Sequence, residues 1–220
     1  MNERQRAILN AVEKFRALSR VHIETMFFER TKNAKNNANN VLKKLCDRGY
    51  LVQNKAFQPF VYHVKGTKLK ANGQKVSQYL QFADVYLEMV KHGSVKQIDI
   101  EPRYQNVEVR PDMFAIWKGS LWFIECQNST FSEKQITEKI QRYEKLLISG
   151  QYKQLPFQKY EKHTFPFVLI IGEGVPYSIT SKHVRIFQAK SIDEFMATIE
   201  RNKQPKAKTE SDGVIRWKIG

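Results

Sequence analysis

Cysteine is scarce in this sequence of 220 residues, which holds only Cys46 and Cys126. The two lie in separate apolar contexts without C-x-x-C spacing, which argues against a disulfide scaffold and a cysteine-rich zinc site. Long apolar runs are also missing, since no stretch approaches the ~20 uncharged apolar residues that span a bilayer. The charged segment from Met1 to Arg6 is not followed by the apolar stretch of a secretory signal. We therefore expect a cytoplasmic protein without a membrane span.

Positive charge is abundant and unevenly distributed. The chain carries 37 Lys and Arg against 22 Asp and Glu, a net charge of +15. Residues 1–75 hold 16 of these cations against five anions, a net charge of +11. Such concentration favours a polyanionic partner, with nucleic acid ahead of a membrane because no helix presents a broad apolar face opposite its lysines. The alternative is a basic domain without a polyanionic partner.

The first third of the chain predicts three helices. Apolar residues recur at helical spacing from Arg6 to Leu18, and Ser19 is a good N-cap for a short second helix. A third helix begins near Ala34 and ends at the Asp47-Arg48-Gly49 stop signal.

The third helix has two different faces. Its apolar stripe, Ala34, Ala38, Val41 and Leu45, lies within ~40° of one direction at the helical period. Asparagine can bond bidentately to an adenine edge and lysine can contact phosphate, so the opposite face suits DNA recognition. The alternative is a solvated asparagine-rich loop. The DNA-binding candidates, including one in the following turn, are Lys32, Lys35, Asn36, Asn39, Asn40, Lys43, Lys44 and Lys55.

A hairpin is expected after Gly49, with strands at residues 50–53 and 60–64 around a turn. Three helices followed by a hairpin resemble a winged helix-turn-helix DNA-binding domain, in which the third helix enters the major groove. The resemblance assigns residues 1–72 to this domain, with the polar stretch Lys65 to Gly73 as a linker.

The rest of the chain predicts a helix, three strands, a helix and another strand. The expected elements are a helix ending at 92, strands at 95–102, 107–117 and 121–127, a helix at 132–148 and a strand at 165–171. Less distinct signals predict a fifth strand at 183–189, a helix at 191–199, a flexible basic tail at 201–212 and an edge strand at 214–219. The expected boundaries are 73–200 for this α/β domain and 201–220 for the tail.

Pro111-Asp112 and Glu125-Cys126-Gln127 stand on two successive expected strands. Here the sequence resembles the PD-(D/E)xK nuclease-like superfamily, which implies that Asp112 and Glu125 share a face and hold Mg²⁺ or Mn²⁺ for phosphodiester cleavage. Gln127 replaces the usual lysine of that motif, and a cation on the following helix can take its place. The candidates for this cation are Lys134, Lys139 and Arg142, of which Lys139 joins the catalytic set of Asp112, Glu125 and Gln127.

A narrower resemblance is to the replication-relaxation family of plasmid and mobile-element proteins. It is carried by the winged-helix pattern, Val109 to Asp112, Ser129-Thr130 and Glu138 to Tyr143. That family usually shows Glu-x-Asp where this chain has Glu125-Cys126-Gln127. Tyr143 lacks the histidine cluster that accompanies a relaxase nucleophile, so we interpret it as a core or helix-face residue.

Taken together, the sequence predicts an α+β protein with an N-terminal winged helix-turn-helix domain and a PD-(D/E)xK nuclease-like α/β domain. Its expected function is site-specific binding of double-stranded DNA in the replication, relaxation or mobilisation of a bacterial plasmid or mobile element, with or without metal-dependent nicking. The resemblance leaves room for a homodimer and for replication or relaxase proteins as partners. The alternatives are a transcriptional regulator with a catalytically silent C-terminal domain and a restriction-type endonuclease.

Overall fold

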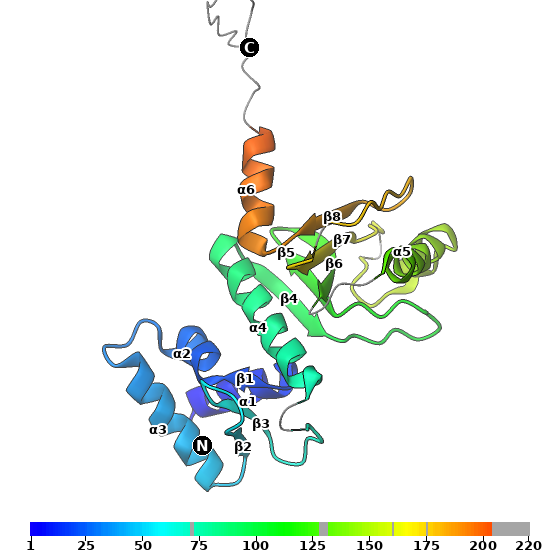
Figure 1. Cartoon of the computed structure of the whole chain (residues 1–220). Coiled ribbons are helices and arrows are strands. Elements are labelled where there is room, and N and C mark those ends of the chain that lie inside the picture. Colours follow the sequence, from blue (N-terminus) through cyan, green and yellow to red (C-terminus); the bar gives the residue numbers. More distant parts are fainter. Residues whose placement is uncertain (71–72, 128–131, 160, 175, 204–220) are drawn as a thin grey trace, which may run out of the picture.

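The computed structural model describes residues 1–70, 73–127, 132–159, 161–174 and 176–203 (Figure 1). The expected edge strand at 214–219 and most of the expected basic tail lie outside these residues. Within the described residues, no helix combines the length and the apolar character needed to cross a bilayer.

The N-terminal unit, residues 1–70, contains three helices and a small antiparallel sheet. The strand order in this sheet is β1-β3-β2, so β3 lies in the middle. The elements are α1 (Glu3–Phe15), β1 (Leu18–Ser19), α2 (Arg20–Phe28), α3 (Ala34–Asp47), β2 (Leu51–Asn54) and β3 (Val61–Val64).

Helix α1 lies three residues further toward the N-terminus than the sequence pattern predicts. Asn2 and Gln5 form a capping box at its start, and Arg16 ends it with a positive φ of 67°. Leu18, which was expected in this helix, instead pairs in β1 with Tyr62 of β3. Ser19 caps α2 as predicted.

The buried face of α3 is rotated slightly from the predicted stripe. Ala38 and Leu45 are buried as expected, but Leu42 is buried with them, while Ala34 and Val41 are only half-buried. The helix itself has the predicted start and end, so the asparagine-rich run is helical and not a loop.

The C-terminal unit, residues 73–203, is built on a mixed five-stranded sheet with the order β4-β5-β6-β7-β8. The pairs β4–β5 and β5–β6 are antiparallel, whereas β6–β7 and β7–β8 are parallel. Its elements are α4 (Gln74–His92), β4 (Val95–Ile100), β5 (Met113–Trp117), β6 (Ser120–Gln127), α5 (Glu133–Ile148), the 3-10 helix η1 (Gln151–Gln154), β7 (Phe167–Gly172), β8 (Ile186–Ala189) and α6 (Ile192–Lys203).

Two elements of this unit have an end that lies more than three residues from the expected position. Strand β5 begins at Met113 and not at Val107, because Asn106 takes a positive φ and Pro111 has no N–H for the ladder. Arg201 to Lys203 belong to α6 and not to the flexible tail.

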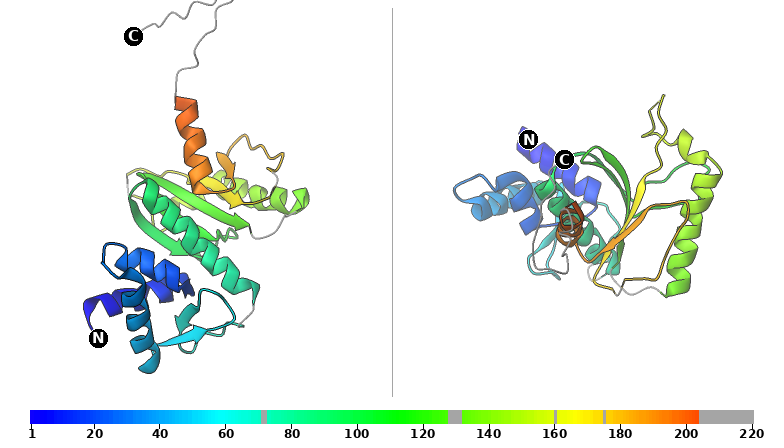
Figure 2. Two further views of the ribbon diagram at one scale, coloured as in Figure 1. Left: turned by 60° about the vertical axis from the view of Figure 1, so that its left-hand side comes forward. Right: turned by 90° about the horizontal axis from the view of Figure 1, so that it is seen from above.

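Helices cover both faces of the large sheet. α4 and α6 lie against one face and α5 against the other (Figure 2). The core on the α5 side contains Phe114, Phe123 and Tyr143. The core on the α4 side is continuous with that of the N-terminal unit, so Ile8 and Met89 belong to one cluster.

Helix α4 also connects the two units through a polar contact. His22 of α2 is buried, and its Nε2 lies 2.8 Å from Asp84 Oδ1 of α4. The backbone N–H of Ser19 donates to His22 Nδ1 at 3.2 Å, so Nε2 carries the proton and donates to Asp84. The two units therefore share both a hydrophobic core and a partly buried hydrogen bond.

Gly172 of β7 is tightly enclosed by β6. A Cβ at this position would lie 2.7 Å from Gln127 O and 2.8 Å from Gln127 Cβ. We expect Gly172→Ala to lower the free energy of unfolding by about 1–3 kcal/mol, because the two strands would have to separate. Urea denaturation measures this loss. Gly174→Ala is the control, since its nearest neighbour lies at 3.9 Å; equal stability of the two variants would contradict the prediction.

Candidate functional site

The β5–β6 hairpin brings the two predicted carboxylates together. Met113 pairs with Ile124, so Asp112 lies opposite Glu125 at the open end of the hairpin. The backbone N–H of Asp112 donates to Glu125 Oε2 at 3.4 Å. The N–H of Cys126 donates to Asp112 Oδ2 at 2.9 Å. Because side chains alternate along a strand, Glu125 faces α5 and Cys126 faces the opposite core.

Glu125 is the most unusual residue of this site, since only 1% of its surface is exposed. Tyr143 OH donates to its Oε1 at 2.5 Å, and Lys139 Nζ lies 2.5 Å from its Oε2. Burial raises the pKa of Glu125 to about 7, and the charge of Asp112 adds to this rise, while Lys139 and Tyr143 act in the opposite direction. The carboxyl therefore holds a proton more tightly than an exposed glutamate.

Lys139 is the one member of the three-cation set that reaches the carboxylates. It is 24% exposed and comes from the middle of α5, whereas Lys134 and Arg142 are exposed on the surface of that helix. Burial lowers the pKa of Lys139, but Glu125 and Asp112 raise it more, so the net shift is upward. Lys139 thus supplies a permanent positive charge beside Glu125.

Gln127 lies further along β6, at its end, and is almost fully buried. Its Oε1 accepts a hydrogen bond from Tyr177 OH at 3.0 Å. Its backbone oxygen accepts one from Gln81 Nε2 of α4 at 3.3 Å. Within the part of the chain that the structure describes, no hydrogen bond joins Gln127 to Asp112 or Glu125. Ser129 and Thr130, which carried part of the family resemblance, lie outside the described residues.

The sequence pattern did not identify two polar residues of the site. Gln78 Nε2 of α4 donates to Asp112 Oδ1 at 3.2 Å, across 34 positions of the chain. Tyr143 is buried as predicted, but its hydroxyl also contacts Glu125. A signal for Tyr143 was present, because it follows Lys139 by four positions and so lies on the same helix face. No local pattern indicates Gln78.

The carboxylate pair does not fit a hydrated divalent cation in this arrangement. Mg²⁺ requires near-octahedral oxygen coordination and usually keeps several waters. Among the described residues, no group of three or more His, Cys, Asp and Glu side chains is placed to hold a metal ion. Glu125 is buried, and the Lys139 ammonium lies against the carboxylate oxygen that a metal would need. Lys139 thus provides the positive charge that the implied Mg²⁺ or Mn²⁺ would otherwise supply.

The residues predicted to bind DNA form a separate group on the N-terminal unit. All eight side chains, on or just before α3 and in the β2–β3 turn, are exposed. Lys43 Nζ pairs with Asp47 Oδ2 at 2.8 Å. This ion pair is exposed and weak, so a DNA phosphate can take the place of Asp47. The structure therefore leaves this surface accessible to a large ligand.

Residues 77–152 match the family model described as "Competence protein CoiA, nuclease-like domain". This segment, about a third of the chain, contains most of α4 and all of β4, β5, β6 and α5. It thus includes Asp112, Glu125, Gln127, Lys139 and Tyr143. The match supports a nuclease-like domain and places the carboxylate pair within it. It does not extend to the N-terminal unit.

No curated protein matches the chain. Among solved structures, protein VC1899 from Vibrio cholerae is 9% identical with a TM-score of 0.31, and the alignment covers 74% of this chain and 42% of that chain. Can2 from Sulfobacillus thermosulfidooxidans, in complex with cyclic tetra-adenylate, is 10% identical with a TM-score of 0.37, over 86% of this chain and 59% of that chain. The chain thus spans less than two thirds of either protein, and both similarities are too low to support a functional conclusion.

The raised pKa of Glu125 makes stability depend on pH. The folded carboxyl titrates at about 7 and the unfolded one near 4.5, so the folded state binds the proton more tightly and its stability falls as pH rises between these values. Glu125→Gln mimics the protonated form and removes this dependence. The quantity to compare is the free energy of unfolding of the wild type minus that of Glu125→Gln. We expect this difference to fall by roughly 1–3 kcal/mol between pH 4.5 and pH 7. Urea denaturation at both pH limits measures it; a difference independent of pH would refute the assignment.

Metal binding should depend on Lys139. We expect calorimetry of the wild type to detect no Mn²⁺ binding that requires Asp112 and Glu125, because the lysine neutralises the pair. Lys139→Met should create such binding, since two close carboxylates without a counter-ion attract a divalent cation. Lys134→Met is the matched control on the exposed face of α5. Wild-type Mn²⁺ binding that is lost in Asp112→Asn would contradict this view.

Proposed function

We propose that the protein binds double-stranded DNA through α3 and the β2–β3 hairpin of its N-terminal unit. The proposal is supported by the order of three helices followed by a hairpin, with β1 pairing on β3, which resembles that of a winged helix-turn-helix domain. The observation that carries the proposal is the exposed face of α3, where asparagine amides stand beside lysine ammonium groups. The net charge of +11 over residues 1–75 supports the same partner.

The two kinds of side chain on this face have different roles in the proposal. Asn36, Asn39 and Asn40 read base edges in the major groove, whereas the lysines of the same surface contact phosphates. Lys55 lies in the turn between β2 and β3, where the wing of such a domain meets the DNA backbone. Sequence preference would then come from the asparagines and general affinity from the lysines.

The nuclease-like domain is the second functional part of the proposal. Its match to the CoiA nuclease-like model and the meeting of Asp112 with Glu125 support action on the bound DNA. We place this action in the replication, relaxation or mobilisation of a plasmid or mobile element. This setting rests on two segments, residues 109–112 and 138–143, which resemble the replication-relaxation family. Homodimer formation and contacts with replication or relaxase proteins belong to the same setting.

A second candidate function is supported by the state of Glu125. Its carboxylate is buried and both oxygens already have partners, so the domain can be catalytically silent and the protein a DNA-binding regulator. Incubation of the protein with supercoiled plasmid and Mg²⁺ or Mn²⁺ distinguishes a nuclease from a regulator. Nicking that is lost in Asp112→Asn, with DNA binding retained, indicates a nuclease; no nicking by either protein indicates the regulator.

DNA binding by the full chain provides the direct test, because the N-terminal unit shares its core with α4. We expect Asn36→Ala, Asn39→Ala or Asn40→Ala to reduce discrimination at a single base position by about 1–3 kcal/mol. Lys35→Ala should weaken binding to all sequences and reduce the slope of log affinity against log salt by about 0.9.

Fluorescence anisotropy on specific and random duplexes separates these effects. Lys134→Ala serves as the control, because this exposed lysine lies on α5 of the C-terminal unit. Equal losses on both duplexes for all three asparagine variants would show that α3 does not read bases. Unchanged affinity in Lys35→Ala and in the remaining lysine variants of the surface would contradict DNA binding by this face.

A further inference from the structure

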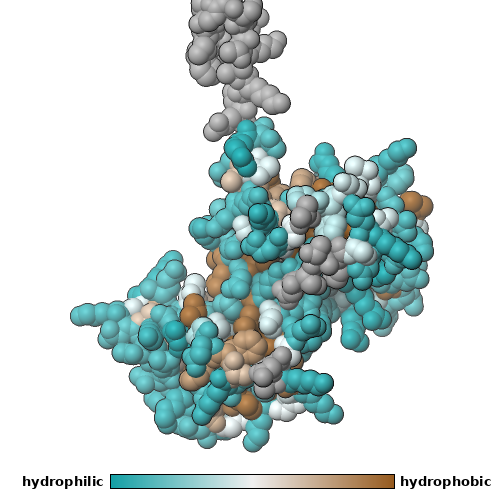
Figure 3. Space-filling model, viewed as in Figure 1, coloured by the Kyte–Doolittle hydropathy of each residue, from teal (hydrophilic) through white to brown (hydrophobic). Residues whose placement is uncertain are grey.

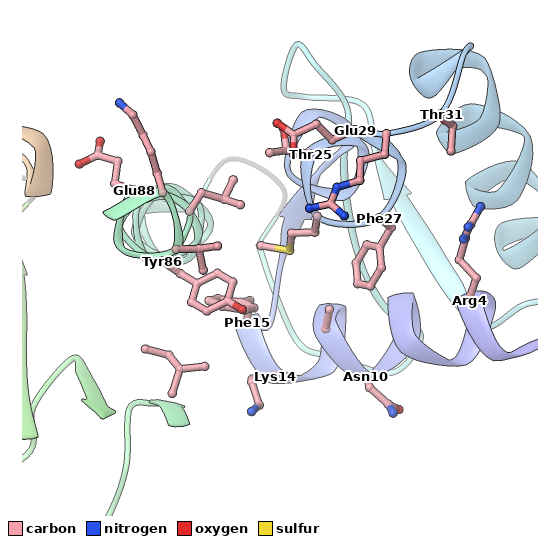
Figure 4. A pocket seen from close by; sticks show the side chains of 17 residues that line it. Arg4, Asn10, Lys14, Phe15, Thr25, Phe27, Glu29, Thr31, Tyr86 and Glu88 are labelled. Carbon is pink, nitrogen blue, oxygen red and sulfur yellow. The ribbon is translucent and has the colours of Figure 1, made fainter. Parts of the chain in front are cut away.

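A groove of about 1030 Å³ lies between the N-terminal unit and α4 (Figure 4). Neither Asp112 nor Glu125 lines it. α1 and the C-terminal half of α2 form one side of it, and the C-terminal half of α4 forms the other. Figure 3 shows apolar surface where the N-terminal unit meets α4. The groove is therefore a separate feature from both the DNA-binding face and the nuclease-like site.

The floor of the groove is apolar and incompletely covered. Met26, Phe27, Tyr86 and Leu87 are each only partly buried, and Val90 is 47% exposed. These side chains come from two different helices, so they form one continuous surface only because the two units pack together. A contiguous apolar surface of this kind, rimmed by polar residues, typically marks a contact with another molecule.

The rim of the groove carries surplus positive charge. Lys91 is paired with Asp193 at 2.9 Å, and Glu88 accepts the N–H of Ile192 at 2.8 Å, so both have partners within the chain. Arg4, Lys14, Arg30 and Glu29 also line the groove, and none of them forms an ion pair within the described ranges. These four residues contribute three positive charges and one negative charge, which suits an acidic ligand.

The spacing of these cations indicates the size of the ligand. Arg4 and Lys14 are ten positions apart on α1, which corresponds to ~15 Å along the helix axis. A single phosphate or nucleotide cannot contact both ends of such a row. A helix of about three turns can, while its apolar stripe covers the floor. We propose that this groove binds an acidic amphipathic helix of a partner protein.

The charge and the floor of the groove disfavour other occupants. Residues 204–220 of this chain carry four Lys and Arg against two Asp and Glu, so they are repelled by the rim. Duplex DNA satisfies the cations but leaves the apolar floor uncovered, because its backbone presents phosphates and sugars. An acidic amphipathic helix satisfies both features. This inference is independent of the nuclease-like site and of the DNA-binding role of α3.

The test uses a synthetic, fluorescein-labelled peptide of about four helical turns, with Leu at the i, i+3, i+4 and i+7 positions and Glu on the remaining face. Anisotropy with the full chain should show saturable binding. The double variant Lys14→Glu, Arg30→Glu should weaken it at least ten-fold, and so should Val90→Asp. Lys134→Glu, on exposed α5, should leave it unchanged. Thermal melting monitored by circular dichroism confirms that each variant is folded.

Four outcomes would overturn the proposal. The first is absence of peptide binding by the folded wild type. The second is equal binding of a peptide with Lys in place of Glu, which would show an apolar contact without charge selection. The third is displacement of the peptide by AMP, which would identify a small-molecule site. The fourth is displacement by duplex DNA together with unchanged peptide binding in Val90→Asp, which would identify a nucleic-acid surface.

Discussion

Burial of the Glu125 carboxylate is the constraint on which the nuclease-like domain depends. A carboxylate removed from water needs a counter-charge and hydrogen bonds close by, because its desolvation is otherwise strongly unfavourable. Lys139 and Tyr143, one turn apart on α5, supply both. This requirement fixes α5 over the sheet at the end of β6. Gln78 of α4 completes the arrangement from the opposite helix by holding Asp112.

The same constraint bears on the chemistry of the domain. A carboxylate pair that already holds a lysine ammonium has less attraction for a divalent cation, since the charge of the metal is partly replaced. Cleavage would therefore require Lys139 to withdraw, or Glu125 to become accessible, when DNA binds. The shared core of α4 and the N-terminal unit, with the His22–Asp84 hydrogen bond, offers a physical connection between the proposed DNA-binding face and this site.

Local patterns predicted the elements better than the contacts between them. The helical periods and caps located α3 and α5, and the motif resemblance brought Asp112 and Glu125 to one face of the sheet. The replacement of the motif lysine by Gln127 pointed to three cations on the following helix, Lys134, Lys139 and Arg142. Which of them reaches the carboxylates depends on how α5 is rotated over the sheet. Gln78 and His22 could not be identified, because their partners are 34 and 62 positions away and the contacts arise from tertiary packing. The start of β5 was misplaced because Pro111 and Asn106 interrupt an otherwise apolar run.

The most direct test of this account is an NMR titration of the Glu125 side-chain carboxyl in the full chain, with and without Mg²⁺. We expect a pKa near 7 that Mg²⁺ leaves unchanged in the wild type and lowers in Lys139→Met, where the carboxylates are open to the metal. A wild-type pKa near 4.5 would contradict the view that burial controls the protonation of Glu125. A wild-type pKa that Mg²⁺ lowers would contradict the view that Lys139 takes the place of a metal ion.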